Sequence, residues 1–133
     1  ERYIKNEMQK LDIYKRIAGI ETQQDYDDML EELLDRFGEP PKAVLNLLTI
    51  ARIKALAHRS YVTEIKQMGK DLKIILYERA KLNPAGFPEL MQKYRRGLQF
   101  KNEQEPKFIL TPVGNLLTAL TDFLNELEKL VEE

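Results

Sequence analysis

Four carboxylates on one side of a predicted helix are the side chains of this chain that are best placed for chemistry. Asp28, Glu31, Glu32 and Asp35 recur at steps of three and four residues, a spacing that places side chains on one face of a helix. Like charges at these steps repel one another by about 0.2–0.5 kcal/mol per pair. A face that repels itself is suited to bind arginines of a partner. The same acids could instead only solubilise the helix and favour its N-terminal half through the helix dipole.

The sequence shows no comparable set of side chains for acid–base catalysis or for metal binding. Carboxylates are numerous, but no His, Lys or Cys stands at a spacing that would share a proton with one or raise its pKa. The only histidine, His58, cannot build a metal site alone, and the chain has no cysteine. The sequence also lacks the phosphate-loop, zinc-protease, serine-hydrolase and dinucleotide motifs. We therefore expect a non-catalytic chain that itself holds no cofactor and no metal.

A basic segment keeps a second class of function open. Residues 40–101 contain thirteen bases and four acids, and bases interleaved with aromatic side chains are typical of nucleic-acid binding. The candidates are Lys93, Arg95 and Arg96 with Tyr94 and Phe100. No recognised nucleic-acid-binding motif accompanies them, and the net charge of the chain is −1. These bases can also be a solvated surface, so a protein-binding module and an accessory nucleic-acid-binding domain both remain open.

The composition is that of a folded globular protein. With 43% hydrophobic and 32% charged residues among 133, the chain is too apolar for a disordered tail and fits one domain. Its apolar runs are far shorter than the ~20 residues of a membrane helix, so no membrane partner is expected. The absence of cysteine is compatible with the cytoplasm. Because the chain opens on Glu1 without an initiator Met, we expect residues 1–133 to be a monomeric piece of a longer multidomain protein, starting with a linker.

The acidic residues belong to the second of three helices predicted in the first half of the chain. Apolar residues at steps of three and four predict the first helix over residues 3–18. A capping box at Thr22 begins the second helix, which Gly38 ends, and Pro40-Pro41 opens the third. The apolar stripes expected to be buried are Ile4, Met8, Leu11, Tyr14, Ile17 and Ala18, then Tyr26, Met29, Leu30, Leu33, Leu34 and Phe37, then Val44, Leu47, Leu48, Ala51, Ala55 and Leu56.

The hydrophobic period changes to two in the second half, which predicts strands. Two β-rich runs, residues 61–68 and 72–77, flank the hairpin turn Gly69-Lys70-Asp71. A short helix opens at Asn83-Pro84, and Pro88 could distort it.

Two shorter strands follow over residues 98–101 and 107–110. Thr111-Pro112 then opens a long helix whose buried side runs from Val113 to Val131. The order of elements predicts an α+β fold. It has an N-terminal three-helix segment, a small antiparallel sheet of about four strands in two hairpins with an intervening helix, and a long C-terminal helix.

Three segments carry a resemblance to a known family. They read LDIYKRIA at residues 11–18, EELLDRFG at residues 31–38 and LLTIARIK at residues 47–54. In this order and spacing the series resembles the C-terminal domain of bacterial transcription-repair coupling factors. The resemblance is specific over about residues 3–59 and rests on helix pattern alone beyond Lys107.

The resemblance implies a regulatory function in a larger protein. Full-length members of that family are ATP-driven, Mg-dependent translocases on duplex DNA that displace stalled RNA polymerase and recruit nucleotide excision repair. The resemblance implies that this domain docks on the N-terminal repair-protein-like module of the same chain and masks the surface that binds the damage-recognition ATPase. It also implies that Glu32 and Asp35, with Asp28 and Glu31 beside them, contact that module. Phe37 is expected to be a core anchor and Gly38 a left-handed cap.

Overall fold

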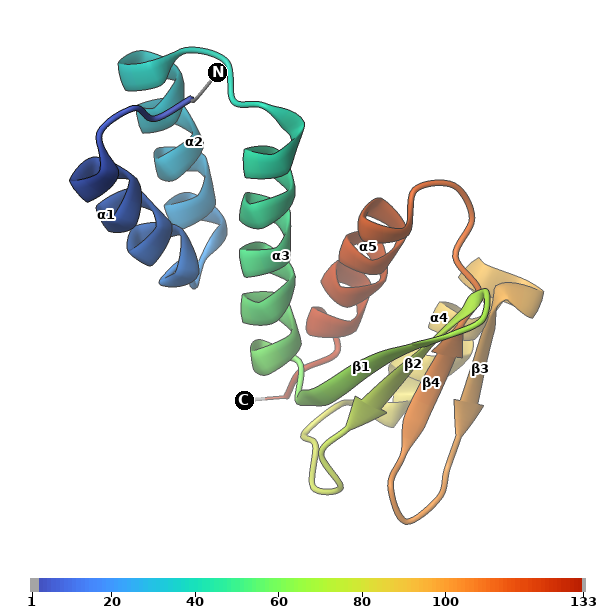
Figure 1. Cartoon of the computed structure of the whole chain (residues 1–133). Coiled ribbons are helices and arrows are strands. Elements are labelled where there is room, and N and C mark those ends of the chain that lie inside the picture. Colours follow the sequence, from blue (N-terminus) through green and yellow to red (C-terminus); the bar gives the residue numbers. More distant parts are fainter. Residues whose placement is uncertain (1–2, 133) are drawn as a thin grey trace. The chain divides into compact units, whose positions relative to one another are not determined.

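Helices form the first part of the chain, and the second part combines a sheet with further helices, as Figure 1 shows from blue to red along the sequence. The computed structural model describes residues 3–132, so Glu1, at the start of the predicted linker, lies outside the described residues. The chain divides into two units, residues up to Ala55 and residues from Leu56 onward, and the division falls inside α3 (Lys42–Arg59). A single domain over residues 1–133 stays a prediction.

The first unit contains α1 (Glu7–Ala18), α2 (Gln23–Phe37) and the first part of α3. Local caps begin the first two helices, because the Asn6 side chain accepts from the backbone N–H of Gln9 and Thr22 forms the predicted capping box. Side chains from all three helices form one apolar core. Its buried members are Ile4, Ile13, Ile17, Ile20, Met29, Leu33, Val44, Leu48 and Ala51.

The predicted apolar stripe of α1 is partly wrong. Met8 is 77% exposed and Leu11 57% exposed, whereas Ile13 and Ile17 are buried. The helix begins at Glu7 and not at residue 3, because Asn6 has an extended backbone and caps it. Packing then turns the Ile13/Ile17 pair, which lies one turn apart, toward the core. Leu34 on α2 and Leu47 on α3 were also predicted as buried and are exposed.

The second unit is built on an antiparallel sheet with strand order β1-β2-β4-β3. The strands are β1 (Val62–Met68), β2 (Asp71–Leu76), β3 (Leu98–Lys101) and β4 (Lys107–Leu110). Gly69 and Lys70 form the turn of the first hairpin, and Gly69 has a φ of 62° that glycine adopts without strain. Asp71 therefore pairs with Met68 as the first residue of β2 and is not part of the turn.

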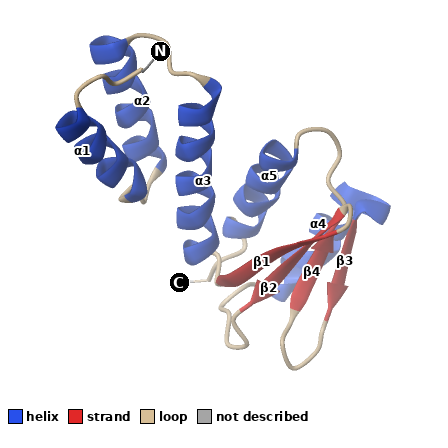
Figure 2. Ribbon diagram, in the orientation of Figure 1, coloured by secondary structure: helices blue, strands red, loops and turns tan. Residues whose placement is uncertain are grey.

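Helices α4 (Phe87–Tyr94) and α5 (Leu116–Glu128) pack on one face of this sheet. The ring centroid of Phe108 on β4 lies 5.4 Å from that of Phe87 on α4 and 5.3 Å from that of Phe123 on α5. Phe108 and Phe123 are fully buried, so this aromatic cluster anchors both helices. Figure 2 shows the helices in blue and the sheet in red. The predicted α+β fold is confirmed.

Two details of the later helices differ from prediction. Pro88 lies in the first turn of α4, where a missing N–H costs no hydrogen bond, so it does not distort the helix. The last helix begins at Leu116 and not near Pro112, because Gly114 has a φ of 78° and the Asn115 side chain caps the helix. Val113 is consequently 90% exposed. Among residues 3–132, no helix has the length and apolar character needed to span a membrane.

Candidate functional site

The predicted acidic face lies on α2, opposite the side that packs in the first unit. Met29 and Leu33 bury the inner side of the helix. The capping box fixes its start, because Thr22 Oγ1 accepts from the Asp25 N–H at 3.0 Å and Asp25 Oδ2 accepts from the Thr22 N–H at 3.3 Å. With both the inner side and the start of the helix fixed, the outer side chains of α2 have a defined direction.

Three of the four predicted acids point to solvent. Asp28, Glu31 and Asp35 are exposed. Asp28 accepts a hydrogen bond from Gln24 Nε2 at 2.7 Å, one turn earlier on the helix. Glu31 and Asp35 form no hydrogen bond or ion pair through their side chains with any residue between 3 and 132. They are therefore available carboxylates on a fixed helix.

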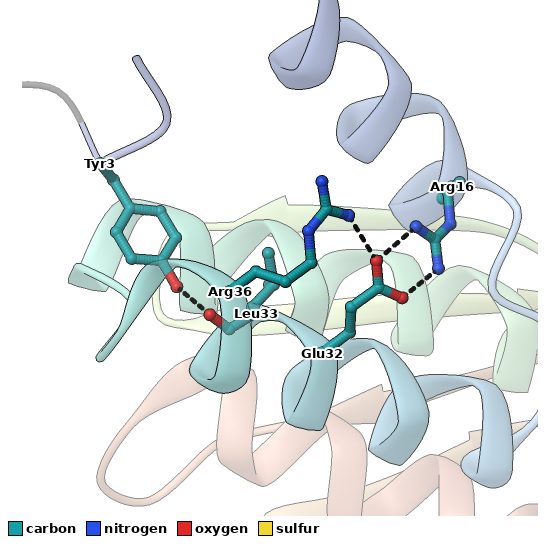
Figure 3. Close-up of polar contacts among 5 residues, drawn as sticks. All are labelled: Tyr3, Arg16, Glu32, Leu33 and Arg36. Carbon is teal, nitrogen blue, oxygen red and sulfur yellow. Dashed lines mark hydrogen bonds and ion pairs between the residues drawn. The ribbon is translucent and has the colours of Figure 1, made fainter. Parts of the chain in front are cut away.

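The fourth acid, Glu32, is turned toward α1 and is held by two arginines (Figure 3). Arg16 of α1 donates through both terminal nitrogens, at 2.7 Å to Oε2 and 2.5 Å to Oε1 of Glu32. Arg36, one turn later on α2, donates to Oε2 at 2.7 Å. The Glu32 side chain is only 28% exposed. This ion-pair network joins α1 to α2 and leaves Glu32 few free lone pairs for a partner.

The network lowers the pKa of Glu32. Hydrogen bonds from Arg16 and then Arg36 are the main causes, and they bring the Glu32 pKa from 4.5 to about 2. The hydrogen bond to Glu32 correspondingly raises the pKa of Arg16. Glu32 is therefore a carboxylate with a structural role at any pH near neutrality.

The sequence missed the role of Arg16 and Arg36. Glu32 and Arg36 stand four residues apart, which is an ion-pair spacing that the sequence displays. Arg16 gives no such signal, because it reaches Glu32 only through the packing of α1 on α2. The expected repulsion between Glu32 and its acidic neighbours is consequently outweighed by attraction to two cations.

Aromatic contacts stabilise the end of α2. The Tyr3 hydroxyl lies 2.6 Å from the Gly38 carbonyl oxygen and 3.1 Å from that of Leu33. The centre of the Phe37 ring lies 5.8 Å from the centre of the Tyr3 ring and 5.0 Å from the guanidinium carbon of Arg36. Phe37 is half-buried against the core, as expected of an anchor. Gly38 has a positive φ of 85° as expected, but its ψ of −163° places it in a region restricted to glycine and not in the left-handed helical region.

The structure does not assemble the basic segment into one site. Tyr94 packs edge-on against Phe123 at 5.7 Å, and Phe100 packs against Phe108 at 4.9 Å. These two half-buried aromatic rings therefore pack against the core of the second unit and do not stand free as platforms for bases. Lys93 pairs with Glu126 at 3.0 Å. Arg95, Arg96 and the single histidine, His58, are exposed, and within the described part of the chain no group of three or more His, Cys, Asp or Glu could hold a metal ion.

Comparisons with known proteins give one consistent family. A family model described as the TRCF domain matches residues 1–87. The transcription-repair-coupling factor of Staphylococcus haemolyticus (strain JCSC1435) is 40% identical over 78 residues, which cover 59% of this chain and 7% of that protein. The corresponding factor of Bacillus subtilis (strain 168) is 36% identical over 80 residues, with 60% and 7% covered. The chain thus matches only a small part of these relatives.

A solved structure matches the fold over most of the chain. The structure titled "Crystal structure of C-terminal domain of transcription-repair coupling factor" superposes with a TM-score of 0.81 at 23% sequence identity. The match covers 96% of this chain and 84% of that one. It therefore extends beyond residue 87, where the family model ends, and includes the sheet and α5.

Proposed function

The chain belongs to the TRCF domain family, and on this premise we propose that it is the C-terminal regulatory domain of a transcription-repair coupling factor. In this proposal the domain is non-catalytic and autoinhibitory. It docks on the N-terminal repair-protein-like module of the same protein and masks the surface that recruits the damage-recognition ATPase. ATP, Mg, RNA polymerase and duplex DNA are bound by other parts of the full-length protein, which acts as an ATP-dependent DNA translocase.

The observation that carries this proposal is the set of available carboxylates on α2. Glu31 and Asp35 are exposed and pair with no residue between 3 and 132, and within that range Asp28 is bonded only to a neutral amide. Carboxylates that are fixed on a helix and not neutralised are ready to form bidentate bonds with arginines. Glu32, in contrast, is already neutralised by Arg16 and Arg36, so we assign it the role of orienting α2 and not of direct contact.

A surface hollow next to this face supports an arginine-bearing partner. It holds about 420 Å³ and is lined by Arg16, Gly19, Ile20, Asp25, Asp28 and Met29. Arg16 on its wall is already paired with Glu32, so the two carboxylates of the hollow favour a further cation. Met29 and Ile20 provide apolar surface for the stem of a long side chain. An arginine reaching Asp28 along this hollow would place its guanidinium against the acidic face.

The direct test is binding in trans. The 133-residue chain and the isolated N-terminal module of the full-length protein are mixed, and their affinity is measured by calorimetry at low and at physiological salt. We expect a complex that weakens with salt and that loses at least about tenfold in affinity when Glu31→Lys and Asp35→Lys are combined. Asp27→Lys, on the same helix and next to the apolar side, is the matched control. If the double reversal binds as tightly as the wild type, the docking face lies elsewhere.

An accessory nucleic-acid-binding function is the alternative, and one observation favours it. The sheet face opposite the aromatic cluster carries lysines on every strand, with Lys66 opposite Lys73 and Lys101 opposite Lys107. Acids offset part of this charge, because Lys66 lies 3.4 Å from Glu64 and Lys107 lies 3.3 Å from Glu103. Sub-micromolar, strongly salt-dependent binding of duplex DNA by the chain would support this alternative.

A further inference from the structure

An apolar groove lies between α1 and α3 in the first unit, away from the acidic face. Its volume is about 180 Å³, and its lining is Tyr14, Ile17, Ala18, Leu47, Ile50, Ala51 and Lys54. Its floor includes the buried core residues Ile17 and Ala51, whereas Leu47 is 41% and Ile50 40% exposed. Met8 and Leu11 extend the apolar surface along α1. Contiguous exposed apolar surface of this kind marks binding sites more often than isolated apolar residues do.

The size of the groove fits side chains of a partner helix. A cavity of roughly 150 Å³ accepts a benzene molecule, so the groove has room for one aromatic or two small aliphatic anchors. Helix α1 has 12 residues and is therefore about 18 Å long at the helical rise. A partner helix of three turns would run the whole length of α1, with anchors at successive turns entering the groove.

The charge around the groove is positive. Lys54 forms part of its wall, and Lys10 lies with its Nζ 5.7 Å from the centre of the Tyr14 ring, which also lines it. Lys15 is exposed on the next turn of α1. The acid Asp12 lies near Arg16, on the side of α1 that meets α2. Glu7 lies two turns before Tyr14 on the same side of α1, so the three lysines outnumber the acid at the groove. The groove therefore carries the opposite charge to the α2 face, and the two surfaces suit different partners.

We propose that the α1/α3 groove binds an amphipathic helix of a partner protein, with aromatic or aliphatic anchors on one side and carboxylates along its flank. The anchors fill the groove between Tyr14, Leu47 and Ile50, and the carboxylates pair with Lys54, Lys10 and Lys15. This site is independent of the α2 docking face. The domain then uses two surfaces. The acidic face of α2 binds an arginine-bearing surface of one partner, and the groove between α1 and α3 binds an acidic helix of another.

A peptide selection tests the groove. Random peptides of about 16 residues, enough for four helical turns, are displayed on phage and selected against the folded 133-residue chain. We expect enriched sequences to have apolar residues at steps of three and four and more Asp and Glu than Lys and Arg. Binding of the synthesised consensus peptide should perturb backbone NMR signals of α1 and α3 and not those of the exposed side of α2.

Matched variants decide the outcome. Ile50→Glu should weaken the consensus peptide at least about tenfold, as loss of an anchor pocket does, while Leu34→Glu, an equally exposed apolar position on α2, should leave it unchanged. Lys54→Glu, which removes no apolar surface, should shift selection toward basic peptides. The proposal is wrong if no peptide is enriched, if the enriched peptides are basic, or if Ile50→Glu and Lys54→Glu bind the consensus as the wild type does. Concentration-dependent self-association that Ile50→Glu abolishes would assign the groove to a second copy and also overturn it.

Discussion

Replacing Glu32 with Gln should destabilise the first unit, because Glu32 holds α1 and α2 together through Arg16 and Arg36. The pKa of Glu32 falls from 4.5 to about 2 in the folded state, which sets an upper limit of roughly 3 kcal/mol for the change in unfolding free energy. Solvent screening at a side chain that is 28% exposed reduces this value, and we expect about 1–2 kcal/mol near pH 7. Urea unfolding of wild type and variant, followed by circular dichroism, measures the difference.

The pH dependence of the unfolding free energy shows whether the ionised Glu32 carboxylate causes this difference in stability. Because the folded-state pKa of Glu32 is depressed, its contribution is complete above about pH 4.5 and disappears as the pH falls toward about 2. The two unfolding curves should therefore converge in acid. Asp35→Asn, which breaks no hydrogen bond or ion pair with residues 3–132, should stay within about 0.5 kcal/mol of wild type near neutral pH. Equal stability of Glu32→Gln and wild type near pH 7, or a difference that persists in acid, would refute the reasoning.

Three further outcomes follow from the geometry. Gly38→Ala should lower the unfolding free energy by about 1–3 kcal/mol, because φ is 85° there, while Gly19→Ala, at a φ of −90°, should cost little by the same urea assay. Phe108→Ala should cost about 3–5 kcal/mol, because this fully buried ring contacts both α4 and α5; a thermal melt that matches wild type would contradict this. Duplex DNA should bind no more tightly than about micromolar at physiological salt, since the net charge is −1, and fluorescence anisotropy over a salt series measures it.

The sequence predicted the elements of this fold well because their signals are local. Each signal acts on the residues next to it in the chain. Thr22 and Asn83 cap the helices that follow them, and Gly69 forms a turn. The start of α5 was misplaced because Val113 fits the apolar pattern of the helix, and that pattern gives no sign of the positive φ of Gly114. Local chemistry thus predicts where elements are, with errors of a few residues at their ends.

Packing between elements was less predictable. The spacing of apolar residues in α1 does not distinguish the buried side chains, Ile13 and Ile17, from the exposed Met8 and Leu11. The same limit applies to the site, since helical periodicity placed Asp28, Glu31 and Asp35 together, but only the packing of α1 on α2 brings Arg16 to Glu32. The sequence therefore identified the acidic face and missed which acid is already neutralised.

The affinity of the full-length protein for the damage-recognition ATPase tests the proposed autoinhibition most directly. Reversing both Glu31 and Asp35 to Lys leaves the Glu32 network intact and should release the masked surface. We predict that the doubly reversed protein, with unchanged thermal stability, binds the ATPase at least about tenfold more tightly, which corresponds to ~1.4 kcal/mol of docking energy. Unchanged affinity in a normally folded double variant would contradict the assignment of the α2 face as the autoinhibitory contact.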